Sequence, residues 1–193
     1  TVDLNTAGTS GGTTKYSDSN NAVTLGTTIV AMNDAPVASG SSTLTAVNED
    51  TASPAGSTVT TLFTGNFSDV TDTVTSGSTA NTLAGVAIVA NLSTSSQGVW
   101  QYYTGSTWTD ISTSLTASTS LTVAAADKLR FIPALDFNGA PGKLTVSLID
   151  SSNSVTSGST VDVSTRGTTT AYSLATVELT TSITAVNDAP LVT

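Results

Sequence analysis

Cysteine and histidine are both absent from the 193-residue sequence. Without cysteine, the chain has no disulfide framework, no thiolate nucleophile and no cysteine-based zinc site. Without histidine, it lacks the commonest general base and the commonest metal-ligating side chain. Most catalytic templates are excluded on these grounds, and we expect a protein that is not an enzyme.

Basic residues are also scarce, because five lysines and arginines stand against 14 acidic residues and give a formal charge of -9. Nucleic acids and anionic membranes are bound by clustered basic side chains, so we expect neither as a partner. The sequence has no apolar run of about 18 residues, which predicts that nothing in it spans a membrane. A divalent cation suits the excess of carboxylates, and calcium is the first cofactor to consider.

One phrase occurs twice, 154 residues apart, as Asn33-Asp34-Ala35-Pro36 and as Asn187-Asp188-Ala189-Pro190. The similarity extends upstream, where Tyr16-Ser17 and the run from Val23 to Ile29 match Tyr172-Ser173 and the run from Val177 to Ile183. Such a long period is typical of tandem whole domains, not of a solenoid. We therefore predict the last strands of a preceding repeat and a linker in 1–36, one complete repeat in 37–190, and the start of another in 191–193.

Short alternating runs bounded by Gly, Asn, Asp or Ser predict an all-β fold. Nine short strands fit an antiparallel β-sandwich better than an open sheet. In the run from Lys143 to Ile149, alternation predicts that Leu144, Val146 and Leu148 point inward. The expected strands are 43–47, 57–62, 83–91, 98–104, 120–123, 128–132, 142–150, 161–165 and 176–186.

Three aromatic residues, Trp100, Tyr102 and Trp108, flank an expected hairpin turn at 104–106. They fit either core packing or an exposed sugar-stacking platform, and we favour the core because aromatic residues dominate small β cores. The segment 124–128 is the only plausible helical turn. Asp136 and Asn138 belong to the segment 136–139, which we interpret as a turn before the next strand.

Carboxylates are few and stand at expected strand ends, where they offer enough oxygen ligands for calcium if the segments converge. Taken singly, each is as readily explained as a solvated turn residue. The candidates are Glu49, Asp50, Asp69, Asp72, Asp150 and Asp188. The pair Asp69 and Asp72 could also be an acid pair for glycoside chemistry, but it lacks the apolar setting that raises a catalytic pKa.

The repeated N-D-A-P, the N-E-D-T at 48–51, the aromatic segment 100–110 and the segments 129–139 and 144–152 resemble the cadherin-like and immunoglobulin-like repeats of giant bacterial surface adhesins. The resemblance covers essentially the whole chain and implies a Greek-key sandwich that serves as a calcium-stiffened extender in adhesion and biofilm formation. It also implies an extracellular location at the bacterial cell surface. By this resemblance, calcium between repeats would be held by Asn33, Asp34, Glu49, Asp69, Asp72, Asp150, Asn187 and Asp188. The run from Asp69 to Asp72 is less acidic than in many relatives, which implies fewer or weaker ions.

The segment from Thr1 to Val30 duplicates strands that the complete repeat already possesses. Isolated strands are marginal in water, so this segment is expected to pack on its own domain or on a neighbour. Donation of its strands to an identical subunit would build an extracellular filament, sheath or surface layer by head-to-tail contacts. The expected partners are thus neighbouring repeats or identical subunits, with carbohydrate as a minor alternative.

Overall fold

The computed structural model describes residues 13–16 and 25–190, and the chain divides into two units, Thr1–Val30 and Ala31–Thr193. In the first unit, residues 13–16 form a turn in which Thr14 Oγ1 donates to the carbonyl oxygen of Tyr16 at 3.2 Å. Leu25 to Val30 form no strand or helix. Most of the predicted strands of a preceding repeat, and the predicted start of a following repeat at 191–193, lie outside the described residues.

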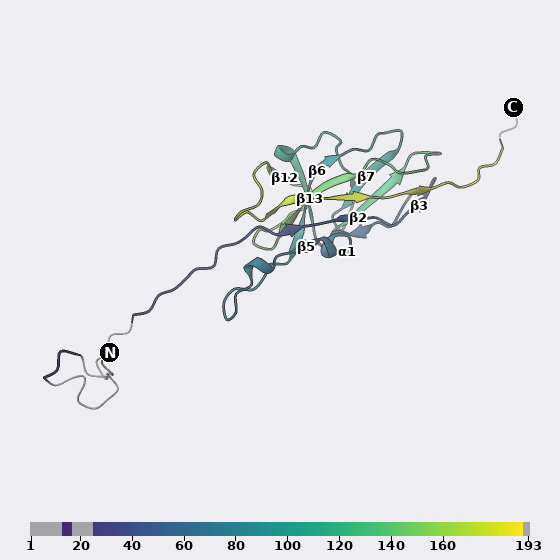
Figure 1. Ribbon diagram of the computed structural model, residues 1–193. Coiled ribbons are helices and arrows are strands. Elements are labelled where there is room, and N and C mark those ends of the chain that lie inside the picture. The colour runs from purple at the N-terminus through teal and green to yellow at the C-terminus, as the bar shows by residue number, and fades with distance from the viewer. Residues whose placement is uncertain (1–12, 17–24, 191–193) are drawn as a thin grey trace. The chain divides into compact units, whose positions relative to one another are not determined.

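The second unit is an all-β sandwich, as the sequence predicted (Figure 1). Two pairs are parallel, β13 with β2 and β14 with β3, and the other pairs are antiparallel. The six-stranded sheet has the order β12 (Thr160–Val161), β9 (Ser120–Ala124), β6 (Leu83–Asn91), β11 (Leu144–Asp150), β13 (Tyr172–Thr180), β2 (Ser41–Thr43). The four-stranded sheet has the order β4 (Ser57–Thr58), β10 (Lys128–Pro133), β7 (Gly98–Tyr103), β8 (Trp108–Asp110). Two further sheets have two strands each. One pairs β1 (Val37–Ala38) with β5 (Phe67–Ser68), and the other pairs β14 (Ile183–Thr184) with β3 (Val47–Asn48).

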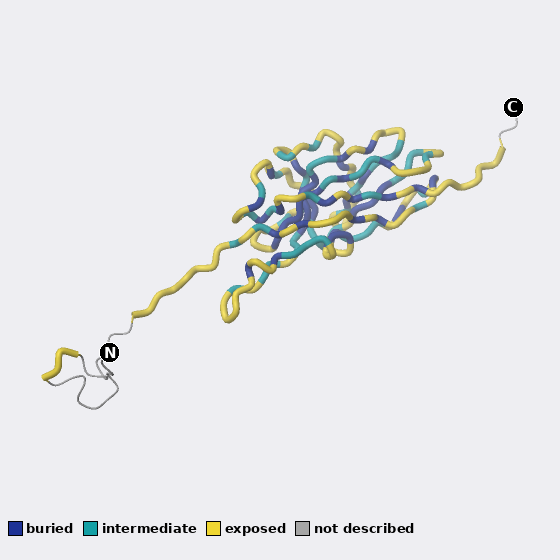
Figure 2. Tube along the Cα trace, in the orientation of Figure 1, coloured by how far each residue is buried: buried dark blue, intermediate teal, exposed yellow. Residues whose placement is uncertain are grey.

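The main core lies between the two sheets and takes its side chains from both. Figure 2 shows the buried positions gathered in the interior of the trace. Leu144, Val146 and Leu148 of β11 are fully buried and belong to this core, which confirms the inward face predicted for these three residues. Trp100 is fully buried as well, stacks edge-on against Phe131 with ring centroids 5.2 Å apart, and donates its indole N–H to the carbonyl oxygen of Gly142 at 2.8 Å. The indole is therefore a core residue with its polar atom satisfied.

A second, smaller cluster covers the outer face of the six-stranded sheet, where Ala87 and Ile149 pack with Val163 and Ala171. Strand β11 is consequently buried on both faces. This explains why Asp150, the last residue of β11, has no exposed surface although it carries a carboxylate.

The segment 57–62, predicted as a strand, instead forms β4 and then the helix α1 (Val59–Phe63). Val59, Leu62 and Phe63 are buried with helical spacing, and the Thr58 side chain caps the helix by accepting from the Thr61 N–H at 3.1 Å. The helical turn predicted at 124–128 is wrong, because those residues form a hydrogen-bonded turn between β9 and β10. Single 3-10 turns occur at η2 (Thr64–Asn66), η3 (Val70–Asp72) and η4 (Ala117–Thr119).

The hairpin of β7 and β8 forms as predicted, with Tyr103 paired to Trp108. Tyr102 is buried, whereas Tyr103 and Trp108 are half-buried. The ring centroids of Tyr103 and Trp108 lie 5.0 Å apart, and the Arg130 guanidinium lies 4.0 Å from the Trp108 ring centroid. The aromatic residues thus serve mainly as core and as support for Arg130. No helix in residues 13–16 and 25–190 is long and apolar enough to cross a membrane.

Candidate metal centres

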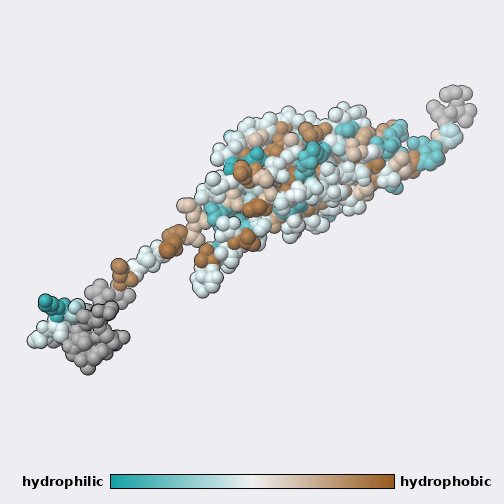
Figure 3. Space-filling view, in the orientation of Figure 1, coloured by the Kyte–Doolittle hydropathy of each residue, from teal (hydrophilic) through white to brown (hydrophobic). Residues whose placement is uncertain are grey.

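Two acidic clusters lie at opposite ends of the sandwich. Between Asp34 and Glu49 the chain passes through β1, β2 and β3 and so runs along the length of the sandwich (Figure 1). The linker 31–36 enters at the first end, and residues 186–190 leave from the second, where Figure 3 shows hydrophilic side chains gathered. We call these groups the N-terminal cluster and the C-terminal cluster.

The N-terminal cluster combines residues from four segments that are far apart in the sequence. Asp69 precedes η3 and Asp72 is its last residue, Asp150 ends β11, Asn81 precedes β6, and Asn33 comes from the linker. All three acids are nearly inaccessible, with 4% of Asp69, 8% of Asp72 and none of Asp150 exposed. The charges of Asp72 and Asp150 lie close enough to repel that of Asp69. Among the described residues, however, only Asp50, Asp136 and Asp188 bring three acid oxygens within 4.8 Å of one another.

Hydrogen bonds hold the N-terminal cluster together. Asp72 Oδ1 accepts from the Asp34 backbone N–H at 2.8 Å, and Asp72 Oδ2 accepts from the Asn81 side-chain amide at 3.0 Å. The Asn33 amide donates to Asp150 Oδ2 at 3.3 Å and to the carbonyl oxygen of Thr170 at 3.2 Å, while the other Asp150 oxygen accepts from Ser152. The donors are therefore neutral amides and hydroxyls.

One carboxylate oxygen of this cluster has no partner. Asp69 Oδ2 accepts from the Asn81 backbone N–H at 2.9 Å, but Asp69 Oδ1 is buried without a hydrogen bond. Burial raises the pKa of Asp69, and repulsion from Asp72 and Asp150 raises it further. The one ion pair among the described residues joins Lys143 and Glu178 elsewhere on the sheet, so no lysine or arginine described here forms an ion pair with the cluster.

The C-terminal cluster is built on two turns and on the departing chain. Carboxylate oxygens of Asp50, Asp136 and Asp188 lie within 4.8 Å of one another, and all three side chains are exposed. Asp50 and Asp136 have left-handed backbone angles, with φ of 64° and 57°, which marks both as turn positions that orient a side chain. Desolvation raises the pKa of Asp188, and repulsion from Asp136, Asp50 and Glu49 adds to it.

Glu49 ties the departing chain to this end of the sandwich. It is 4% exposed, and its Oε1 accepts from the backbone N–H of Val186 at 2.6 Å. Its Oε2 accepts from the Asn138 amide at 3.1 Å. Both carboxylate oxygens are thus engaged, and Glu49 fixes the direction in which residues 186–190 leave.

The structure brings together most of the residues that the sequence singled out, and divides them between the two ends. Asn33, Asp69, Asp72 and Asp150 share the N-terminal cluster, to which Asp34 contributes its backbone N–H while its side chain is exposed. Glu49, Asp50 and Asp188 share the C-terminal cluster, and Asn187 is exposed beside it. Sequence reasoning missed three members: Asn81, Asp136 and Asn138.

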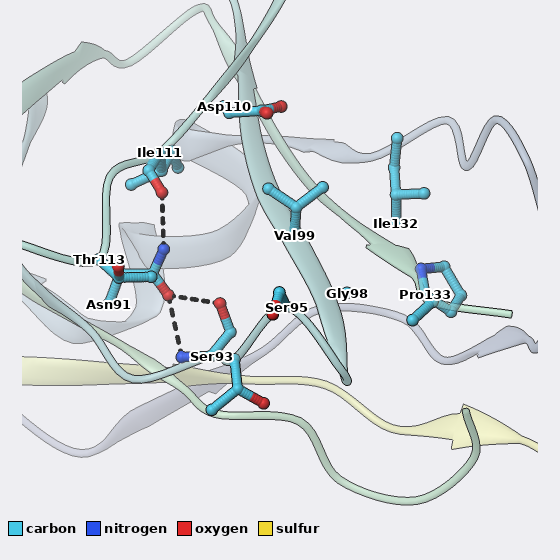
Figure 4. A pocket seen from close by; sticks show the side chains of 12 residues that line it. Asn91, Ser93, Ser95, Gly98, Val99, Asp110, Ile111, Thr113, Ile132 and Pro133 are labelled. Carbon is cyan, nitrogen blue, oxygen red and sulfur yellow. Dashed lines mark hydrogen bonds between the residues drawn. The ribbon is translucent and has the colours of Figure 1, made fainter.

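A hollow of about 660 Å³ at the end of β7, drawn in Figure 4, lies among Asn91, Asp110, Ile111 and Ile132. The Asn91 amide is fully engaged, donating to the carbonyl oxygen of Ile111 at 2.8 Å and accepting from Ser93. The residues that line this hollow include no aromatic ring and one acid, Asp110. This composition suits neither sugar stacking nor paired acid-base chemistry.

Chemically, the acidic clusters are the parts of the described chain best suited to a ligand. Their ligand atoms are carboxylate, amide and carbonyl oxygens, the set that hard divalent cations prefer. A cation would also partner Asp69 Oδ1 and relieve the repulsion within each group. Comparison with family models, with curated proteins and with solved structures finds no match to this chain.

Proposed function

We propose that this chain is a calcium-binding extender repeat of a large secreted bacterial adhesin, in which calcium stiffens the junctions between consecutive repeats at the cell surface. The observation that carries the proposal is the behaviour of the two N-D-A-P copies. In both, the Asn side-chain amide donates to the carbonyl oxygen of the next Asp at 3.0 Å, in Asn33 to Asp34 and in Asn187 to Asp188. The two linkers thus share one local hydrogen bond.

Each copy of the linker contacts a different end of the sandwich. At the start of the domain, Asn33 and the Asp34 backbone bind the N-terminal cluster. At the end of the domain, the Asp188 carboxylate joins Asp50 and Asp136. In a tandem array a single linker would make both sets of contacts at once, and would bring the C-terminal cluster of one repeat next to the N-terminal cluster of the following repeat.

Such a junction would gather six or more carboxylates around one short linker, which is unfavourable without cations. Calcium accepts six to eight oxygen ligands in flexible geometry, whereas magnesium demands a strict octahedron, so clusters contributed by several segments favour calcium. Pro36 and Pro190 lack a backbone donor and restrict φ, which keeps the chain extended as it enters each domain. Bound calcium would convert a flexible string of domains into a rod that carries adhesive domains outward.

A chain of two complete repeats tests the proposal. We expect small-angle scattering in calcium to give a longer maximum dimension and a narrower range of shapes than in chelator, because the ions fix the angle at the junction. Asp110→Asn, an exposed acid away from both clusters, serves as the control, and Asp72→Asn in the second repeat should abolish the difference. Identical scattering with and without calcium would contradict the proposal.

A second candidate, a filament or surface-layer subunit assembled by strand complementation, is favoured by one observation. At a constant offset of 154 residues, Leu25 and Ile29 match Leu179 and Ile183, which are 0% and 4% exposed, yet Leu25 and Ile29 are themselves 96% and 90% exposed. Residues 25–29 therefore repeat apolar positions that face the core in β13 and β14, but their own side chains at these positions are exposed. Sedimentation of the chain over a range of concentrations separates the two candidates. Assembly that grows with concentration and that Leu25→Asp prevents would support the filament, and a monomer at every concentration would contradict it.

A further inference from the structure

We propose that the side-chain amide of Asn81 occupies the position of a cation in the N-terminal cluster while the ion is absent, and that it turns over to become a ligand when the ion binds. The inference rests on the proposed function, since it concerns the calcium site of that cluster. It adds a residue that supplies no charge and lies outside every acidic motif of the sequence.

The geometry around Asn81 is that of a donor inserted between acceptors. Its Nδ2 lies 2.8 Å from Asn33 Oδ1 and 3.0 Å from Asp72 Oδ2. An amide NH₂ carries partial positive charge, so it offsets part of the repulsion between oxygens that would otherwise face each other. A calcium ion would take the same oxygens as ligands, and the NH₂ group cannot remain there because it has no lone pair to offer.

The surroundings of Asn81 accept either orientation of its amide. The backbone N–H of Asn81 donates to Asp69 Oδ2 at 2.9 Å, which holds the residue in position while the side chain rotates. On the opposite side, Ser151 Oγ donates to Asn81 Oδ1 at 3.1 Å and accepts from the Thr82 N–H at 3.1 Å. A hydroxyl can donate or accept, so Ser151 can also accept from Nδ2 after the amide has turned.

Turning the amide produces a set of oxygen ligands. Asn81 Oδ1 would then point toward Asn33 Oδ1 and Asp72 Oδ2, beside the carboxylate of Asp69. Asp69 is 4% exposed and its Oδ1 has no hydrogen-bond partner, which independently indicates a missing ligand at this place. Asn81 therefore makes the ion-free cluster tolerable and sets how tightly the ion binds.

Calorimetric titration with calcium tests the inference, in a background where Asp136→Asn and Asp188→Asn remove the C-terminal cluster. Asn81→Leu removes both the donor and the ligand, and we expect it to weaken binding about tenfold. Asn81→Asp supplies an oxygen and a charge but no donor, and we expect binding about tenfold tighter together with a lower melting temperature in chelator. Asn153→Asp, which adds the same charge on an exposed residue near the cluster, should change the affinity by less than Asn81→Asp does.

Nuclear magnetic resonance of the unmutated chain gives a second measurement that does not depend on the variants folding. We expect the two Asn81 side-chain amide protons to shift and to exchange faster with water when calcium is added, because they leave Asn33 and Asp72. Unchanged Asn81 resonances on saturation with calcium, or equal affinities in all three Asn81 forms, would overturn this inference alone. Absence of any calcium binding by the unmutated chain would overturn the proposed function as well.

Discussion

The backbone N–H of Asp34 donates to Oδ1 of Asp72 at 2.8 Å, and so joins the linker to a turn 38 residues further along the chain. The next N–H, that of Ala35, donates to the carbonyl oxygen of Thr168 at 2.7 Å. The linker is thus fixed at two points immediately before β1. Because Asp72 also accepts from Asn81, the same side chain holds the linker and the N-terminal cluster.

Asp72→Asn is expected to separate stability from calcium binding. The amide oxygen can still accept from the Asp34 N–H. The new amide nitrogen replaces the oxygen that accepts from Asn81, so this bond is kept only if the Asn81 amide turns to present its oxygen. Because loss of one charge also relieves repulsion, the melting temperature in chelator should then rise or stay constant. The stabilisation by calcium, about 2.7 kcal/mol when the ion is present at a hundred times its dissociation constant, should largely disappear for this site. Thermal unfolding in calcium and in chelator measures both effects, with Asp110→Asn as the control. An undiminished calcium effect in Asp72→Asn would argue against a site at this end.

Asp136→Asn tests the C-terminal cluster in the same way. The carboxylates of Asp50, Asp136 and Asp188 lie within 4.8 Å of one another, so removal of one charge should weaken a cation there. The two clusters lie at opposite ends of the sandwich. We therefore expect the losses of calcium-binding free energy caused by Asp72→Asn and by Asp136→Asn to add within about 0.5 kcal/mol. The double variant, compared with each single variant by calorimetric titration, checks this. A strong departure from additivity would mean that the two ends are coupled through the domain.

The raised pKa of Asp69 predicts an unusual pH dependence for the ion-free protein. The folded state binds this proton more tightly than the unfolded chain, whose Asp has the ordinary pKa of 3.8. Stability from this group is therefore fully present below that value and is lost as pH rises through the raised folded-state pKa. In chelator, we expect acidification from neutral pH toward the ordinary Asp pKa of 3.8 to stabilise the unmutated chain relative to Asp69→Asn. Parallel pH profiles of the two proteins would show that Asp69 is not the group responsible.

Alternation and turn residues were sufficient to predict the strands that carry the main core. The inward face of β11, the hairpin of β7 and β8, and the burial of Trp100 all follow from local patterns. The helix α1 was missed because Val59, Leu62 and Phe63 span only one turn, and because Thr-rich sequence favours extended backbone when nothing else is known. Its stability comes from burial of those three side chains and from the Thr58 cap, which only the folded structure reveals.

The acids of the candidate sites were predictable as types but not as neighbours. Asp69, Asp72 and Asp150 stand at the ends of elements, and only the order of strands determines that they meet. Asp136 was interpreted as a turn residue, and it is one, with a φ of 57°, but the turn also directs its carboxylate toward Asp50 and Asp188. Asn81 gave no signal at all, because a single Asn in a loop rich in Ser and Thr has many ordinary explanations.

Two tryptophans near one hairpin should contribute very differently to stability. Trp100 is fully buried, packs against Phe131 and has its indole N–H bonded to Gly142, so Trp100→Ala should lower the free energy of unfolding by about 3–5 kcal/mol. Trp108 is half-buried and contacts Arg130 through a cation-π interaction, so Trp108→Ala should cost about 1–2 kcal/mol. Urea denaturation followed by circular dichroism measures both. Equal costs would mean that the hairpin tip, and not the space between the sheets, holds this part of the sandwich together.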